Sequence, residues 1–217
     1  EHLAIIHAAW GGHPAHALRA EQSCVLRQVI WAGGEYHFLA SGSEIRACLV
    51  GYVGGSLGLW APVEINGLIM LEPTHGFEVQ GEGESTIENA LTRGCVAFNS
   101  PTRVKNCAFL NLIRVKKGAV IFNSCVLQEV IGDTPDITIQ SCGLIRGVAE
   151  KATIGAGSFL FKPQFINPDV LDYRLGPQTV FSPGVTLKQA IGVRYTPEML
   201  EVIQVALELR RAGIIKF

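Results

Sequence analysis

Apolar and polar residues along the chain follow one short pattern that recurs many times. In each copy an apolar residue and a spacer precede a small or polar residue, which is followed by Cys or another compact apolar residue and then a further apolar residue. The clearest copies are the segments 104–109, 122–127 and 139–144, and looser copies are 45–50, 65–70 and 87–92, with 23–26 as a seventh. The compact apolar position falls at residues 24, 48, 68, 90, 107, 125 and 142, in steps of 17 to 24 residues. Such regular spacing predicts a repeat architecture.

The spacing inside each copy predicts two β-strands joined by a sharp bend. Up to the small or polar residue the apolar positions alternate with a period of two, as they do in a strand. The following residue is apolar as well, and a straight strand cannot shift its inward face in this way without turning core side chains toward solvent. The predicted bend residues are of types that tolerate bend dihedrals, namely Ser23, Ala47, Gly67, Asn89, Asn106, Ser124 and Ser141. One coil is therefore a strand, a bend, a second strand and a return loop, and successive coils pair in parallel about 4.8 Å apart.

Leucine-rich repeats have a comparable length and are the main alternative to this interpretation. They need a Leu-rich consensus and a helical return segment in each repeat. The returns in this chain, such as 76–85 and 132–136, carry Gly, Pro and Asp instead. We therefore predict an all-β solenoid, a parallel β-helix with about seven to eight coils over residues 1–185.

Two parts of the chain resemble a known family. The copies around Asn106-Cys107, Ser124-Cys125 and Ser141-Cys142 resemble coils of the pectin-lyase-like right-handed parallel β-helix proteins. The later segments 165–168, 172–175 and 182–184 are similar to the closing segment that often follows the last coil in such proteins, although Gly184-Val185 replaces the usual small residue and Ile-Asp pair. The resemblance spans roughly residues 18–185. It implies a right-handed solenoid and says little about activity, because this fold carries lyases, hydrolases, epimerases and non-catalytic modules.

Residues 186–217 are predicted to form a capping segment with an α-helix over about 197–212. Thr196 suits the N-cap and Pro197 the first helical position, and Gly213 is a natural stop. The helix is apolar around more than one face, which predicts burial. We expect it to pack over the last coil, with docking to another subunit or domain as the alternative. The N-terminal end shows no comparable cap and is expected to continue from preceding coils.

Composition excludes several classes of protein. Charged residues make up 17% of the chain and hydrophobic residues 48%, which is unlike a disordered segment. The net charge of −1 argues against binding to a nucleic-acid backbone. The longest uncharged run, 47–63, is shorter than a membrane-spanning helix and contains several Gly residues and Pro62. The chain does not begin with Met, so we expect a processed or excised piece of a longer protein.

The cysteines are predicted to be structural. Cys107, Cys125 and Cys142 fall at the same inward position of successive coils, which favours a buried ladder of small side chains that Cys48 and Cys24 extend. Disulfides between adjacent rungs also fit the spacing, so the redox compartment stays open. No Cys-x₂-Cys spacing suggests a metal site, and the His13-Pro14-Ala15-His16 pair lacks further ligands.

No acid/base constellation is evident in the sequence. A glycosidase needs two carboxylates about 5 to 9.5 Å apart, and a lyase needs a base together with a cationic group such as Ca²⁺. The Asp clusters, Gly-His-Gly and Asp-His elements that the resemblance would imply for an enzyme are missing. Weak candidates for a binding site are Glu82, Glu84, Asp133, Asp136 and Trp60. Trp10, Trp31 and Trp60 could stack on sugar rings if they are exposed.

Two functions are therefore expected. The first is a non-catalytic structural or binding module of a larger exported protein, with a polysaccharide or another protein domain as partner and no cofactor. The alternative is a carbohydrate-active enzyme, a polysaccharide lyase or glycosidase, for which Ca²⁺ would be the expected cofactor. Outward carboxylates or basic groups from successive coils that converge in a groove would favour the enzyme.

Overall fold

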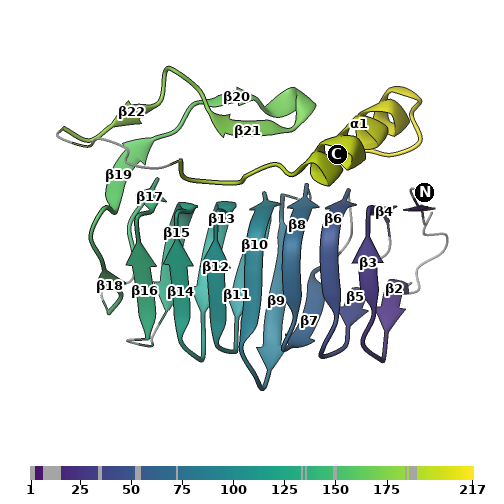
Figure 1. The fold of residues 1–217 in the computed structure, drawn as a ribbon, viewed down its shortest axis with the longest axis horizontal. Coiled ribbons are helices and arrows are strands. Elements are labelled where there is room, and N and C mark those ends of the chain that lie inside the picture. Colours follow the sequence, from purple (N-terminus) through teal and green to yellow (C-terminus); the bar gives the residue numbers. More distant parts are fainter. Residues whose placement is uncertain are drawn as a thin grey trace.

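A computed structural model of the chain describes residues 3–6, 16–33, 36–51, 55–71, 73–132, 134, 136–148, 151–183, 185 and 190–217. It is a parallel β-solenoid of about seven turns with a C-terminal helix, as the sequence predicted (Figure 1). Most turns contribute one strand to each of three parallel rows. Within the described residues no helix is long and apolar enough to cross a bilayer.

The strands of the three rows are as follows. The first row holds β3 (Val25–Arg27), the first halves of β6 (Glu44–Val50), β8 (Glu64–Met70) and β10 (Ser85–Thr92), and β12 (Thr102–Lys105), β14 (Val120–Asn123), β16 (Ile137–Gln140) and β18 (Thr153–Ile154). The second row holds β1 (Leu3–Ile6), β4 (Val29–Ala32), the second halves of β6, β8 and β10, the first parts of β13 (Ala108–Val115) and β15 (Val126–Gly132), and β17 (Gly143–Leu144) and β19 (Phe159–Lys162). The third row holds β2 (His16–Ala20), β5 (Tyr36–Leu39), β7 (Leu57–Ala61), β9 (His75–Gly81), β11 (Cys95–Phe98) and the last parts of β13 and β15.

The bend between the first and second rows is made by one residue per turn in the left-handed backbone region. Six of the predicted bend residues have a positive φ, namely Ala47, Gly67, Asn89, Asn106, Ser124 and Ser141. A single left-handed residue rotates the chain direction sharply and moves the inward face by one position, as the apolar pattern requires. The predicted strand–bend–strand unit is therefore confirmed for these six turns.

The seventh predicted bend, at Ser23, is wrong. Val25 pairs with Glu44 and Leu26 with Ile45, so Cys24 lies level with Ser43 and not with Cys48. The left-handed residue of this turn is Gln28, at φ 53°, and Val29 takes the inward position beside Cys48. The local likeness of Ser23-Cys24 to the later copies misled the alignment, because this turn places its bend at a longer side chain.

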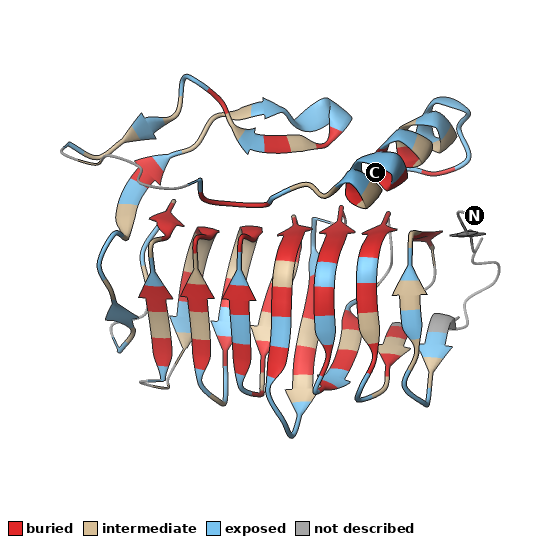
Figure 2. Cartoon of the chain, in the orientation of Figure 1, coloured by how far each residue is buried: buried red, intermediate tan, exposed pale blue. Residues whose placement is uncertain are grey.

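The predicted return loop at 76–85 is wrong, because it contains a strand of the third row. β9 occupies most of the segment 76–85 that was expected to be a loop. Strands β7, β9 and β11 alternate buried and less buried residues, so their inward side chains close the third side of the interior. Figure 2 shows this alternation along the strands.

The solenoid interior is a continuous apolar core. Its largest fully buried side chains include a stack of aromatic rings from the second and third rows and β14, namely Phe77, Phe98, Phe109 and Phe122. Neighbouring rings in this stack have centroids 5.8 to 6.5 Å apart and mostly meet edge to face, as aromatic pairs prefer.

A second apolar cluster lies outside the second row. Its solenoid members point outward from β4, β6, β8, β10, β13 and β15: Ile30, Leu49, Ile69, Leu91, Ala108 and Val126. The C-terminal part of the chain covers them. After β19 the chain forms the antiparallel pair β20 (Phe165–Asn167) and β21 (Asp172–Leu175), joined by the 3₁₀ turn η1 (Pro168–Val170), and then β22 (Val180–Phe181) pairs antiparallel with β19.

Helix α1 (Pro197–Arg211) ends this covering segment. Thr196 caps it by accepting a hydrogen bond from the Met199 amide, as predicted. The prediction that the helix packs over the last coil is wrong. It lies across the side of the solenoid beside β4 and β6, far along the stack from β19 (Figure 1). The outward apolar residues of the second row need a cover there, and Met199 reaches so close to Gly67 that a Cβ at that position would lie 2.9 Å from its Sδ.

Candidate functional site

The outer face of the first row carries a polar groove of ≈ 410 Å³ over β6, β8 and β10. Its polar side chains are Arg46, Glu64, Asn66, Thr86 and Glu88. Alternation along the strands points them away from the core, and the register sets Arg46 beside Asn66 and Asn66 beside Glu88. The same register sets Glu44 beside Glu64. Neighbouring strands are about 4.8 Å apart, so carboxylates that are distant in sequence gather on one surface.

Most charges of this face are already paired. Arg46 bonds Glu44 at 2.5 Å, and Lys105 lies 3.8 Å from Glu88. The Glu64 side chain has no hydrogen bond or ion pair with a described residue. Exposed ion pairs contribute only about 0–1 kcal/mol each, so these pairs orient side chains more than they stabilise the fold. The unpaired Glu64 carboxylate is left to water or a ligand.

Trp60 lies where the third row turns into the first and is 43% exposed. Its ring meets Phe38 edge to face, with centroids 6.1 Å apart. It extends over Gly81 of the next turn, where an added Cβ would lie 3.2 Å from Trp60 Cε3. Gly81, at φ 101°, thus leaves room for the ring to lie along the surface. Phe38, Trp60 and Gln80, which pairs with Trp60, form an outward surface that we call the Trp60 platform.

The structure brings three of the predicted site residues together. Glu82 and Glu84 are exposed in the turn that follows β9, directly after Gly81. Gly83 of this turn packs on Pro62, two residues after Trp60, since a Cβ there would lie 3.0 Å from Pro62 Cδ. Glu84 accepts a hydrogen bond from Arg103 at 2.7 Å. The turn therefore sits between the Trp60 platform and the groove of the first row.

The remaining predicted site residues lie elsewhere. Asp136 is exposed and accepts a hydrogen bond from the Thr134 hydroxyl. Backbone hydrogen bonds link the turn of Glu84 to that of Pro101, then to that of Ala119, and then to that of Asp136, so Asp136 lies three turns along the stack from Glu84. Asp133 lies outside the described residues. Trp31 is fully buried in the core, and Trp10 also lies outside the described residues. Within the described part of the chain no group of His, Cys, Asp and Glu side chains could hold a metal ion.

Sequence reasoning missed the groove residues Arg46, Glu64, Asn66 and Glu88. Each is the outward residue one or three positions before a bend, so the signal was present as a polar spacer inside every copy. It was not recognised because such spacers are ordinary solvent-facing residues until the register stacks them.

The buried cysteines are unsuited to nucleophilic chemistry. All six cysteines are free thiols, and Cys107, Cys125 and Cys142 are fully buried. The Cys125 amide donates to Cys142 Sγ at 3.4 Å, and the Ala90 amide donates to Cys107 Sγ at the same distance. Burial raises the pKa of the Cys125 thiol well above its ordinary value and that of Cys48 to about 11. A reactive cysteine needs the opposite shift. That these thiols form a purely structural ladder stays a prediction.

Comparison of the chain with protein-family models, curated proteins and solved structures finds no match. The fold alone therefore defines the class, a parallel β-solenoid, and the function must be argued from the surface that the solenoid presents.

Proposed function

We propose that this chain is a non-catalytic binding module of the pectin-lyase-like, right-handed β-helix kind, and that it binds an extended polysaccharide. The observation that carries the proposal is the Trp60 platform, whose indole is partly exposed, has room to extend over Gly81, and is flanked by carboxylate and amide groups. Sites for small polar ligands typically combine aromatic surface with a few placed polar groups. Trp offers a large apolar face at low entropic cost, which suits the apolar face of a sugar ring.

Polar groups beside the ring would hold the hydroxyl groups of the sugars. Glu82 and Gln80 lie next to Trp60 on the neighbouring turn, and Glu64 is two residues beyond Pro62 on the groove side. A polymer that crosses from the platform into the groove would meet new polar side chains at intervals of about 4.8 Å. The rigid repeat suits a long ligand better than a small one, because successive turns present similar groups along the stack.

The test is a binding screen with acidic and neutral polysaccharides, read by affinity electrophoresis and calorimetry. Aromatic anchors commonly contribute about 2 kcal/mol or more, so we expect Trp60→Ala to weaken binding about 30-fold. The matched control is Leu160→Ala, which removes an apolar side chain of comparable exposure at β19. Binding that is unchanged in Trp60→Ala would contradict the proposed site.

A second candidate function, a carbohydrate-active enzyme, is favoured by the carboxylates of the groove. Glu44 and Glu64 come from successive turns and face outward in register, and Glu88 lies on the next turn. Paired carboxylates at such spacing can serve as general acid and nucleophile. Following new reducing ends and unsaturated products in the same screen, with and without Ca²⁺, decides between the two. Turnover that Glu64→Gln or Glu82→Gln abolishes would replace the binding module by an enzyme.

A further inference from the structure

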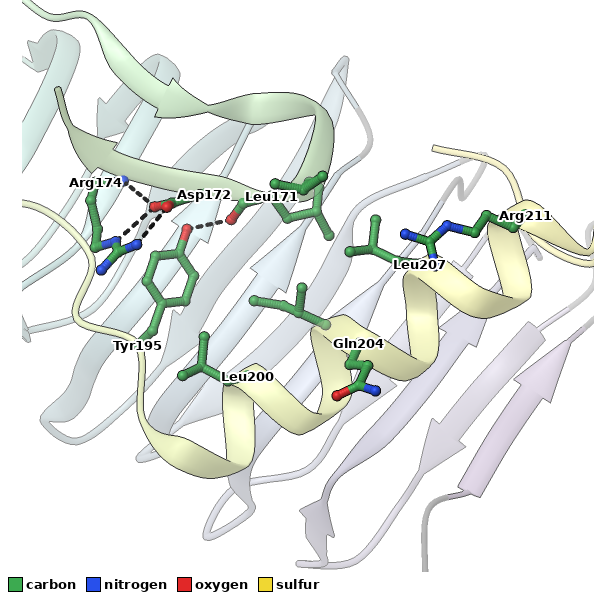
Figure 3. A pocket seen from close by; sticks show the side chains of 10 residues that line it. Leu171, Asp172, Arg174, Tyr195, Leu200, Gln204, Leu207 and Arg211 are labelled. Atoms are coloured by element: carbon green, nitrogen blue, oxygen red, sulfur yellow. Dashed lines mark hydrogen bonds and ion pairs between the residues drawn. The ribbon is translucent and has the colours of Figure 1, made fainter.

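A cavity of ≈ 450 Å³ lies between helix α1 and the β20–β21 hairpin, away from the surface discussed above. Figure 3 shows the helix on one side and the hairpin on the other. Its apolar walls are formed by Leu200, Ile203 and Leu207 of the helix and by Val170 and Leu171 of the hairpin. A volume of this size is within the range of small-molecule sites, about 300–1,000 Å³.

The helix supplies this wall because it has two apolar stripes. Met199, Val202 and Ala206 are buried beneath it in the cluster that covers the second row. Leu200 and Leu207 are seven residues apart, so they share a different face, and Leu200 is 54% exposed. Val170 on the opposite wall is 42% exposed. Large apolar side chains thus face one another across the cavity without closing it.

The cavity is held open by hydrogen bonds at both ends. At the helix start, the Tyr195 hydroxyl donates to the Leu171 carbonyl at 2.6 Å and accepts from the Tyr173 amide at 2.9 Å. At the helix end, Arg210 Nη1 donates to the Asp169 carbonyl at 3.1 Å. The backbone of Leu171 is left-handed (φ 63°), which is a strained conformation for a leucine. Strained backbone conformations are often found at functional positions. The walls are therefore organised before any ligand arrives.

One charge of the lining has no partner among the described residues. Arg174 is neutralised by Asp172 through two hydrogen bonds of 2.8 and 2.6 Å, and the guanidinium lowers the pKa of that carboxyl. The Arg211 side chain makes no hydrogen bond or ion pair with a described residue. In Figure 3 its guanidinium extends from the last turn of the helix toward Leu207. The lining thus combines an apolar slot with one uncompensated cation at its end.

We infer that this cavity binds a small apolar molecule that carries a single carboxylate. The hydrocarbon part lies between the leucines of the helix and the hairpin wall, and the carboxylate accepts hydrogen bonds from Arg211. A guanidinium suits a planar carboxylate because it can donate two parallel hydrogen bonds. This site is independent of the polysaccharide surface.

The experiment measures binding of sodium decanoate, decanol and decyltrimethylammonium to the whole chain by calorimetry. We expect saturable binding of decanoate, weaker binding of decanol and none of the cation. Arg211→Gln should weaken decanoate about three- to tenfold, as an exposed charge-assisted contact allows, and leave decanol unchanged. Arg194→Gln is the matched control, since it removes an exposed cation of the same segment that does not line the cavity.

A second variant tests the apolar walls. Leu200→Ser changes a largely exposed side chain, so the helix should keep its buried face and its far-ultraviolet spectrum. It should weaken decanoate and decanol alike. Equal affinity for decanoate and decanol in the original chain, or no saturable binding of either, would overturn the inference.

Discussion

The Tyr195 phenol group is one of the polar contacts that attach the β20–β21 hairpin to the rest of the molecule. The Tyr195 hydroxyl makes two hydrogen bonds to the hairpin backbone, to Leu171 and Tyr173, and Tyr195→Phe removes both while it keeps the ring. Each such bond contributes about 0.5–1.5 kcal/mol net, so the variant should weaken hairpin docking by about 1–3 kcal/mol. That range corresponds to opening that is about five- to 150-fold more frequent.

Hydrogen exchange with mass spectrometry measures this opening segment by segment. We expect faster exchange in β21 and η1, with β8 and β10 unchanged, because both hydrogen bonds of the phenol hydroxyl go to the hairpin backbone. Tyr173→Phe is the matched control, since its hydroxyl makes no hydrogen bond within the described part of the chain. Exchange in β21 that is the same in Tyr195→Phe and in the original chain would refute the argument. An equal increase in all strands would refute it as well, because it would show that the hairpin does not open separately.

Three further predictions concern the core and the thiols. Phe98→Ala removes one ring of the buried aromatic stack and should lower the free energy of unfolding by about 3–5 kcal/mol. Thermal unfolding should then show a Tm lower by roughly 6–20 °C. Phe38→Ala is the control and should lower Tm much less, because Phe38 is only partly buried. Burial raises the pKa of the Cys48 thiol from 9.0 to about 11, so its contribution to the free energy of unfolding is fully present below pH 9. This contribution, about 3 kcal/mol, is lost as the pH rises toward 11. Urea unfolding at several pH values should show this loss, and Cys48→Ala should reduce it. Ellman's reagent should titrate the half-buried Cys24 and Cys95 before unfolding and the four buried thiols only afterwards; prompt reaction of all six would contradict the described burial.

The functional surface was only partly predictable from the sequence. Local patterns reveal the repeat and single candidate residues, but they do not show which residues of different turns lie together. Trp60, Glu82 and Glu84 were recognised as candidates because an aromatic ring and carboxylates in a Gly-rich turn are local features. That these residues lie together while Asp136 does not follows from the register of successive turns. The register depends on the lengths of all the intervening segments, and these vary from turn to turn.

The sequence by itself determined the repeat, the parallel strands of the first two rows, six of the bends and the C-terminal helix. A period-two pattern interrupted by a small or polar residue permits few backbone paths, and the left-handed residues from Ala47 to Ser141 lie where the pattern placed them. Thr196 and Pro197 likewise begin the helix through local hydrogen bonding and geometry.

Only the tertiary structure decided where the C-terminal segment packs. The second row has outward apolar residues that must be covered, namely Leu49, Ile69 and Leu91. The sequence around these residues does not indicate which segment covers them. The continuous apolar runs after each bend, typical of strands buried on both faces, were the available signal. The covering segment lies more than a hundred residues away in sequence, so its position follows from the burial of both surfaces together. That arrangement also creates the cavity beside α1, which no local pattern in either element predicts.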